Sequence, residues 1–327
     1  MEKNKKIDNI INDLVNVTDM VIKYNNSDNN FIFERNNTNK IIKTKEFVTN
    51  NKILKNNINK NIKEIYRKEV INFINILEKE LDHCNLENIN NNLDSLSVQT
   101  FNNFKFTNKN TLAFYNIFSN KLLLINKNWK KTITHELLHM TTCKKLNNKY
   151  ICCGFDIVNL RKSKKYGVFI NEGYTELINN RYFTETNCYS INKVFVHLLE
   201  IIIGKDLMEK LYFNTDLVGL INELMKYNNT LEDVIKFIIN TDTIHKNLFK
   251  LSIKKRIKLR KSLIEVNDFL INTYYEKVKT YAKTEEDYNI PINLFIGVLK
   301  TIKLDIGFND KYVKELKEYK EKKLVKN

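Results

Sequence analysis

The chain has 327 residues, a formal net charge of +16, seven glycines and one proline. This length is sufficient to bury at least one sizeable hydrophobic core, and two lobes are the natural expectation. So few glycines and prolines exclude a turn-rich all-β architecture and favour long helices. We therefore expect an α+β fold that is mostly helical and contains a small sheet.

The positive charge is dispersed, with local concentrations at residues 161–165 and 254–261. Asn, Lys and Ile are abundant together, and A/T-rich codons encode all three, so genome composition accounts for much of the basicity. Neither concentration carries the interleaved aromatic residues that stack on nucleic-acid bases. We expect solvated helix faces and no specific nucleic acid binding, with attraction to anionic surfaces as the alternative.

Cysteine spacing and the N-terminal sequence bear on the location of the protein. Five cysteines form an odd set without framework spacing, which predicts reduced thiols in a reducing compartment. The residues that follow Met1 have no apolar stretch behind their charges, and no segment approaches the ~20 apolar residues of a membrane span. The expected location is the cytoplasm, with leaderless export as the alternative, and no membrane span is expected.

The N-terminal region, residues 1–94, is predicted to be helical. Apolar residues recur at helical spacing over residues 7–24 and 61–84. Phe31–Phe33 is a candidate short strand. The Asn-rich stretch 85–94 is expected to break the helical pattern and to link two lobes.

Residues 95–188 differ in composition and are predicted to form a small mixed α/β core. Residues 112–115 and 121–125 are typical of two strands joined in a hairpin. The second strand leads almost directly into a helix that contains His135.

The remainder, residues 189–327, is predicted to be a helical C-terminal lobe. Helical periodicity covers residues 190–204, 206–228, 230–240, 245–282, 291–303 and 309–325. Pro291 stands at a favoured position in the first turn of its segment.

Two of the five histidines lie in the pentapeptide His135-Glu136-Leu137-Leu138-His139. Residues four apart lie on one face of a helix, so both imidazoles can reach a single metal ion. Glu136 lies between them on the neighbouring face, where a carboxylate can hold and deprotonate a metal-bound water. The pentapeptide predicts one zinc ion per chain, and a surface helix with incidental histidines is the alternative.

A third ligand is predicted in the segment Ile170–Leu177, which reads I-N-E-G-Y-T-E-L. A catalytic zinc site takes three protein ligands and leaves one position for water. Glu172 supplies the third ligand, with 32 residues between it and His139. The alternative assignment makes Glu176 the ligand and Glu172 its support.

The sequence H-E-x-x-H followed by an N-E-G-x-x-E helix resembles the gluzincin metallopeptidases, the group that contains thermolysin-like and aminopeptidase-N-like enzymes. The resemblance extends from the strand before His135 to about Arg181. It implies a zincin-like catalytic core in residues 95–188, with Glu172 as a zinc ligand and Glu176 steadying a zinc-binding histidine from behind. The interval between the second histidine and Glu172 is longer than in those two branches, so no branch is assigned.

The same resemblance implies two further roles. An edge strand near the active helix binds an extended substrate, a role expected for residues 121–126, with an internal strand as the alternative. A Tyr or His beyond the third ligand stabilises the oxyanion of the reaction. The candidates for that donor are Tyr174, Tyr182, His197 and His245, although the apolar stretch around His197 favours a core histidine there.

Small residues near the motifs have simpler interpretations. The missing side chain of Gly173 is expected to let the ligand helix approach the histidine helix closely, with a helix start as the alternative. Cys143, Cys152 and Cys153 are expected to be small buried hydrophobic residues and not ligands of a second metal.

These patterns together predict a zinc-dependent peptidase that acts on a peptide or protein substrate. Glu136 would act first as general base and then as general acid. One alternative is a non-catalytic, zinc-stabilised interaction module. Another is a dedicated regulatory protease that cleaves a single intracellular partner. The base in the motif favours an enzyme, because a structural zinc site needs none.

Overall fold

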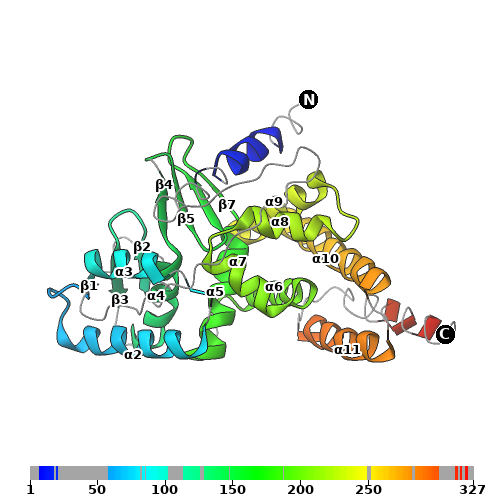
Figure 1. Cartoon of the computed structure of the whole chain (residues 1–327). Coiled ribbons are helices and arrows are strands. Elements are labelled where there is room, and N and C mark those ends of the chain that lie inside the picture. Colours follow the sequence, from blue (N-terminus) through cyan, green and yellow to red (C-terminus); the bar gives the residue numbers. More distant parts are fainter. Residues whose placement is uncertain are drawn as a thin grey trace, which may run out of the picture.

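The structure is a computed structural model of the chain. It describes residues 7–17, 20, 58–81, 83–84, 86–101, 113–125, 129–146, 148–186, 188–248, 252–281, 284–301, 314–315, 317–318 and 321–322. The described part is mostly helical, as predicted, and has two small sheets where one was expected (Figure 1). The strand expected at Phe31–Phe33 and most of the helix expected at 309–325 lie outside the described residues. Within the described ranges, no helix combines the length and apolar character needed to cross a bilayer.

Helices occur where the periodicity predicts them, with shifted boundaries. After a first helical segment at residues 7–17, those outside the site are α2 (Glu64–Glu80), α3 (Leu86–Ser95), α6 (Ser190–Ile203), α7 (Lys205–Phe213), α8 (Leu217–Met225), α9 (Leu231–Asn247), α10 (Ile253–Tyr281) and α11 (Glu285–Thr301). The single helix expected at 206–228 is interrupted, because Thr215 has a φ of +62° and Asp216 begins α8 by accepting the Gly219 N–H. Pro291 lies inside α11, so its expected place in the first turn was wrong.

The boundary between α9 and α10 lies later than predicted. The gap expected at 241–244 is helical because the Thr241 and Thr243 hydroxyls donate to carbonyls one turn back, those of Ile238 and Ile239, each at 2.8 Å. Bonded in this way, polar side chains remain compatible with a continuous helix.

Helix α3 occupies the Asn-rich stretch that was expected to be a linker. Asn88 and Asn92 donate from their side chains to carbonyls at the end of α4 (Ile133–Thr142), each at 2.8 Å. The last carbonyls of a helix have no partner within that helix, so these amides satisfy them. The linker prediction was wrong because the asparagines cap another helix.

The first sheet has the strand order β1-β3-β2. Strands β2 (Ala113–Asn116) and β3 (Lys121–Ile125) form the predicted antiparallel hairpin. Strand β1 (Ser97–Phe101) pairs in parallel with the other edge of β3. Strand β3 is therefore internal, and the expectation that residues 121–126 form a substrate-binding edge was wrong. Among the described strands, β2 has the outer edge nearer the active helix.

Residues 144–166 form a four-stranded antiparallel sheet that the sequence analysis did not predict. Its strands, in spatial order, are β4 (Lys144–Leu146), β5 (Tyr150–Cys153), β6 (Asp156–Asn159) and β7 (Lys164–Tyr166). Gly154 begins the turn between β5 and β6 with a φ of +52°, and any side chain there would collide with Asn171. The glycine therefore lets the tip of this hairpin touch the ligand helix.

Helices α4 and α5 (Val168–Tyr182) occupy the middle of the molecule. Figure 1 shows α2, α3 and the first sheet at one end and helices α6 to α11 at the other. Helix α5 packs against α4, α6 and α9, and α4 also contacts β2, β5 and α3. Buried residues of all three predicted regions belong to one continuous hydrophobic cluster.

The N-terminal helix is attached to the second sheet through Asp13, which is 1% exposed. Its carboxylate accepts hydrogen bonds from Tyr150 Oη (3.2 Å), Asn159 Nδ2 (3.0 Å), Lys162 Nζ (2.8 Å) and Tyr166 Oη (3.0 Å). Burial opposes ionisation, but the hydrogen bonds from Lys162 and Tyr166 and the Lys162 charge outweigh it and lower the pKa of Asp13. One ionised side chain therefore anchors this helix.

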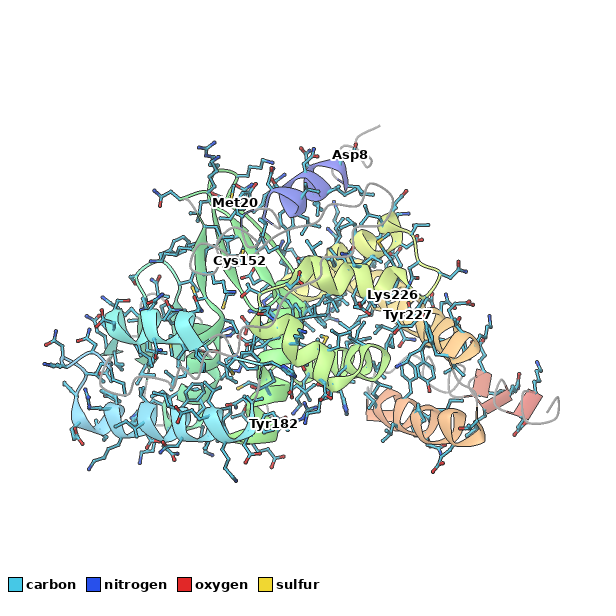
Figure 2. The ribbon with its side chains drawn as sticks, in the orientation of Figure 1. Asp8, Met20, Cys152, Tyr182, Lys226 and Tyr227 are labelled. Atoms are coloured by element: carbon cyan, nitrogen blue, oxygen red, sulfur yellow. The ribbon has the colours of Figure 1, made fainter. Side chains whose placement is uncertain are left out.

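Replacement of Asp13 by Asn is expected to lower the free energy of unfolding by about 1–3 kcal/mol at neutral pH, because the amide cannot pair with the Lys162 ammonium. The stability that Asp13 contributes is fully present above its ordinary pKa of 3.8 and is lost as pH falls through the lowered folded pKa. The difference from wild type should therefore shrink at acid pH in denaturant titrations. Asp8→Asn, on the same helix (Figure 2), is the exposed control, and an equal effect in both variants would contradict the anchor.

Candidate metal centre

Three donor atoms converge where α4 faces α5. The Nε2 atoms of His135 and His139 lie 3.1 Å apart. Glu172 Oε2 lies 3.4 Å from the first nitrogen and 3.5 Å from the second. Both histidines are buried, and the Glu172 side chain is 19% exposed. In the part of the chain that the structure describes, this is the only His, Cys, Asp or Glu group with such spacing.

The spacing of these donors fits a tetrahedral zinc ion. Ligands at ~2.0–2.1 Å from a tetrahedral centre lie about 3.3–3.4 Å from one another. The observed separations of 3.1, 3.4 and 3.5 Å have this size. Two imidazole nitrogens and one carboxylate oxygen also form a donor set that is typical of catalytic zinc sites. The residues present therefore fit one metal ion.

Glu176 holds His135 from behind. Its Oε2 lies 3.0 Å from His135 Nδ1, and its other oxygen accepts a hydrogen bond from the Thr186 hydroxyl. A carboxylate at Nδ1 keeps the proton on that nitrogen and leaves Nε2 free for a metal. With both oxygens directed to protein groups, Glu176 has the geometry of a support, and Glu172 has that of a ligand.

The tip of the β5–β6 hairpin contacts the back of His139. Cys153 Sγ lies 3.6 Å from His139 Nδ1 and donates to the His139 carbonyl at 3.2 Å. Burial raises the pKa of Cys153, so this group remains a thiol. Asn171 Nδ2 lies 3.4 Å from the same ring nitrogen, while its Oδ1 accepts the Phe155 N–H at 3.1 Å. The β4–β7 sheet therefore helps to orient a predicted ligand.

Glu136 joins the active helix to the edge strand. It is 9% exposed, and its Oε2 accepts the Tyr115 N–H at 2.6 Å. Burial raises the pKa of Glu136, against the charges of the two neighbouring histidines, which lower it. In an antiparallel pair, alternate residues direct their backbone groups to opposite edges, so Tyr115 and Ala113 both direct theirs outward.

Two of the four candidate oxyanion donors are engaged elsewhere. Tyr174 donates its hydroxyl to Glu200 at 3.0 Å, and Tyr182 donates to Glu209 at 2.9 Å. Tyr174 also lies about 200° around α5 from the ligand carboxylate. His197 is half-buried on α6, where burial lowers its pKa against the opposing charge of Glu200. The two tyrosine hydroxyls are therefore directed to acidic residues of α6 and α7.

A tyrosine that the sequence analysis missed lies at the centre. The Tyr189 ring stacks on His135 with centroids 5.5 Å apart and 15° between the planes. His245, the fourth candidate donor, stacks on Tyr189 at 6.3 Å and 16°. The nearby charge of Glu172 raises the pKa of Tyr189, which is 39% exposed. His245 therefore contacts Tyr189, and the Tyr189 ring separates it from the predicted ligand His135.

The backbone of Tyr189 is unusual for an aromatic residue. Its φ is +48°, in the left-handed region, immediately before α6 begins. Such conformations cost free energy and concentrate at functional sites. The only sequence signal is an aromatic residue directly before a helical segment, and spacing from Glu172 alone does not single it out.

Gly173 permits a close approach, but to α6 and not to the histidine helix. A Cβ at this position would lie 2.7 Å from the Asn192 carbonyl oxygen and from Val196 Cγ2. The expected partner was wrong because Gly173 lies about 100° around α5 from Glu172, so the two positions face different helices. The glycine sets the distance between α5 and α6.

Comparisons with known protein families, with curated proteins and with solved structures give no match. The observations that bear on function are therefore the three converging donors, the carboxylate beside them and the edge strand that it contacts.

Purified wild-type protein, handled without chelator, is expected to contain about one zinc ion per chain, as measured by mass spectrometry. Glu172→Ala should lose most of the metal because it removes a donor. Glu176→Ala should retain a site whose affinity is about 10–100-fold weaker. The exposed control Glu185→Ala should match wild type.

Two results would contradict this assignment. Metal loss chiefly in Glu176→Ala would mean that Glu176 is the ligand and Glu172 its support. Folded wild-type protein that takes up no zinc, even when zinc is added, would overturn the centre itself.

Proposed function

We propose that the chain is a zinc-dependent peptidase in which Glu136 is the general base. The observation that carries this proposal is a buried carboxylate beside three donors at tetrahedral spacing. A structural zinc site closes its fourth position with a protein ligand. Among the described residues the group has three members, which favours an open position for water and substrate.

His135, His139 and Glu172 would hold the ion, and Glu176 would fix the ring of His135. A bound zinc ion would supply a Lewis acid that polarises a scissile carbonyl and lowers the pKa of water toward 7. Glu136 accepts the proton of the attacking water and delivers it to the leaving amine nitrogen. Because Tyr115 N–H binds Oε2, the other oxygen, Oε1, is the one available for this transfer.

The outer edge of β2 supports a peptide as the substrate. The same edge that presents Tyr115 N–H to Glu136 also presents the backbone groups of Ala113. An extended chain that pairs with this edge through its own backbone would pass beside Glu136. Recognition through main-chain hydrogen bonds favours peptides over other hydrolysable compounds.

Tyr189 is the side chain that we assign to the oxyanion. Its ring is held by stacking between His135 and His245, and the nearby charge of Glu172 raises its pKa. A fixed donor is effective because it needs no reorganisation when charge develops on the substrate. This assignment replaces the four candidates from the sequence.

Glu136→Gln is expected to lower the rate of peptide hydrolysis by about 10²–10⁴-fold while zinc content stays at the wild-type level. The amide keeps an oxygen for the Tyr115 N–H but cannot accept the water proton. The measurements are cleavage of casein and of short fluorogenic peptides, with metal analysis of the same samples. Glu185→Gln is the exposed control, and a fully active Glu136→Gln enzyme would refute the mechanism.

A protease dedicated to one partner would leave generic peptides intact. Its products would instead be new protein N-termini in a cell lysate treated with wild-type enzyme and not with Glu136→Gln. If neither assay yields a product that depends on Glu136, the non-catalytic interaction module becomes the better description.

Tyr189→Phe is expected to lower kcat by about 100-fold and to leave zinc content and KM near wild type, because the ring stack stays and one oxyanion donor is lost. Tyr182→Phe is the control, since that hydroxyl is bound to Glu209. The readout is the separate measurement of kcat and KM. A normal kcat in Tyr189→Phe would remove this residue from the mechanism.

A further inference from the structure

The first turns of α10 are exposed, basic and apolar at the same time. Ile253 is 77% exposed and Ile257 is 66% exposed. No acidic residue occurs between Ile253 and Ser262. The cationic side chains in these turns are Lys254, Lys255, Arg256, Lys258, Arg260 and Lys261, and all are exposed.

The two isoleucines are not explained by a solvated helix face. They are the most exposed large hydrophobic side chains in the part of the chain that the structure describes, ahead of Phe118 at 57%. They lie one turn apart and therefore share a face of the helix. Further along α10 the same side of the helix is buried at Ile271, so the two isoleucines continue a packing face of the helix to a point where it is exposed.

Cations flank the two isoleucines on both sides. At 100° per residue, Arg256 and Arg260 lie on one flank of the Ile253–Ile257 line, and Lys254 and Lys258 lie on the other. Lys261 is 3.7 Å from Glu265, and among the described residues no ion pair within 4.0 Å involves the remaining five cations. The face therefore presents an apolar centre with a rim of positive charge.

We propose that this face, residues 253–261, binds the surface of an anionic lipid bilayer. The helix would lie in the interface, with Ile253 and Ile257 between the headgroups and the lysines and arginines at the lipid phosphates. Amphipathic helices with basic flanks bind membranes in this orientation. Each Lys or Arg near an anionic membrane strengthens binding about fivefold, so the charges and the apolar pair act together.

A lipid surface explains the face better than a nucleic acid does. Phosphates of DNA or RNA would use the cations but would leave both isoleucines in water. Residues 253–261 also contain no aromatic ring for stacking on bases. A bilayer surface takes up both kinds of side chain at once.

The face lies toward the end of α9 that reaches the metal centre. The two helices are antiparallel, as Phe237 stacks on Phe269 and Asn240 donates to Glu265 at 2.7 Å. The start of α10 therefore lies beside the end of α9, where His245 stacks on Tyr189. Membrane binding would bring the centre near the lipid surface, although the proposal does not depend on peptidase activity.

The test is cosedimentation of the full chain with vesicles of phosphatidylcholine alone or mixed with phosphatidylserine. Wild type is expected to bind only the mixed vesicles and to dissociate as salt is raised. Ile253→Ser/Ile257→Ser should weaken binding about tenfold. Lys254→Gln/Lys258→Gln should weaken it about 25-fold.

Matched controls lie on α2 and just before it, where Ile65 is 54% exposed and Lys60 and Lys68 are exposed. Ile65→Ser and Lys60→Gln/Lys68→Gln should bind as wild type does. The proposal is overturned if wild type does not bind the mixed vesicles, or binds phosphatidylcholine alone equally well. It is also overturned if the double Ile→Ser variant binds the mixed vesicles normally. A nucleic acid would be the better partner if a duplex oligonucleotide displaces the protein fully from the vesicles and binds the Ile→Ser variant normally but the Lys→Gln variant weakly.

Discussion

The contact between α4 and α5 imposes the constraint on which the rest of the structure depends. It places two imidazoles and a carboxylate, largely removed from water, within 3.5 Å of one another. Polar groups at such a distance in a low-dielectric interior need partners whose positions are fixed. A cation can satisfy all three donors at once, but only if neither helix turns or slides. The surrounding elements hold these two helices in position.

Each helix is fixed from several directions by distant parts of the chain. The carboxylate of Asp242, on α9, accepts the N–H groups of Gly167 at 2.9 Å and Phe169 at 3.1 Å, and so caps the start of α5. Near the other end, Arg181 pairs with Glu200 and Glu209, which ties α5 to α6 and α7. Helix α4 is held by the α3 asparagines at its end and by the edge strand at Glu136. These contacts, together with those of the β4–β7 sheet, hold the two helices that form the centre.

The sequence predicts those features that depend on local spacing. His135 and His139 share a face because they are four residues apart, and the β2–β3 hairpin follows from two short apolar runs. The strands of the β4–β7 sheet have three or four residues and include exposed lysines such as Lys164, so no apolar alternation marks them. The parallel pairing of β1 and the position of Tyr189 depend on contacts between distant segments, which no single-sequence pattern contains. For the same reason, the edge strand was assigned to the wrong member of the hairpin.

The buried carboxyl group of Glu136 is difficult to explain by fold stability alone. Burial opposes the ionisation of its carboxyl group, and a single backbone N–H on one oxygen compensates only in part. An apolar side chain of similar size would pack at this position on α4 without that penalty, because burying a partly paired charge often destabilises a fold relative to hydrophobic packing. Its neighbours Leu137 and Leu138, both fully buried, illustrate what stability alone would favour. A carboxylate placed against that preference, one residue from a predicted metal ligand and bonded to the outer edge of β2 among the described strands, supports the proposal that Glu136 accepts and returns a proton.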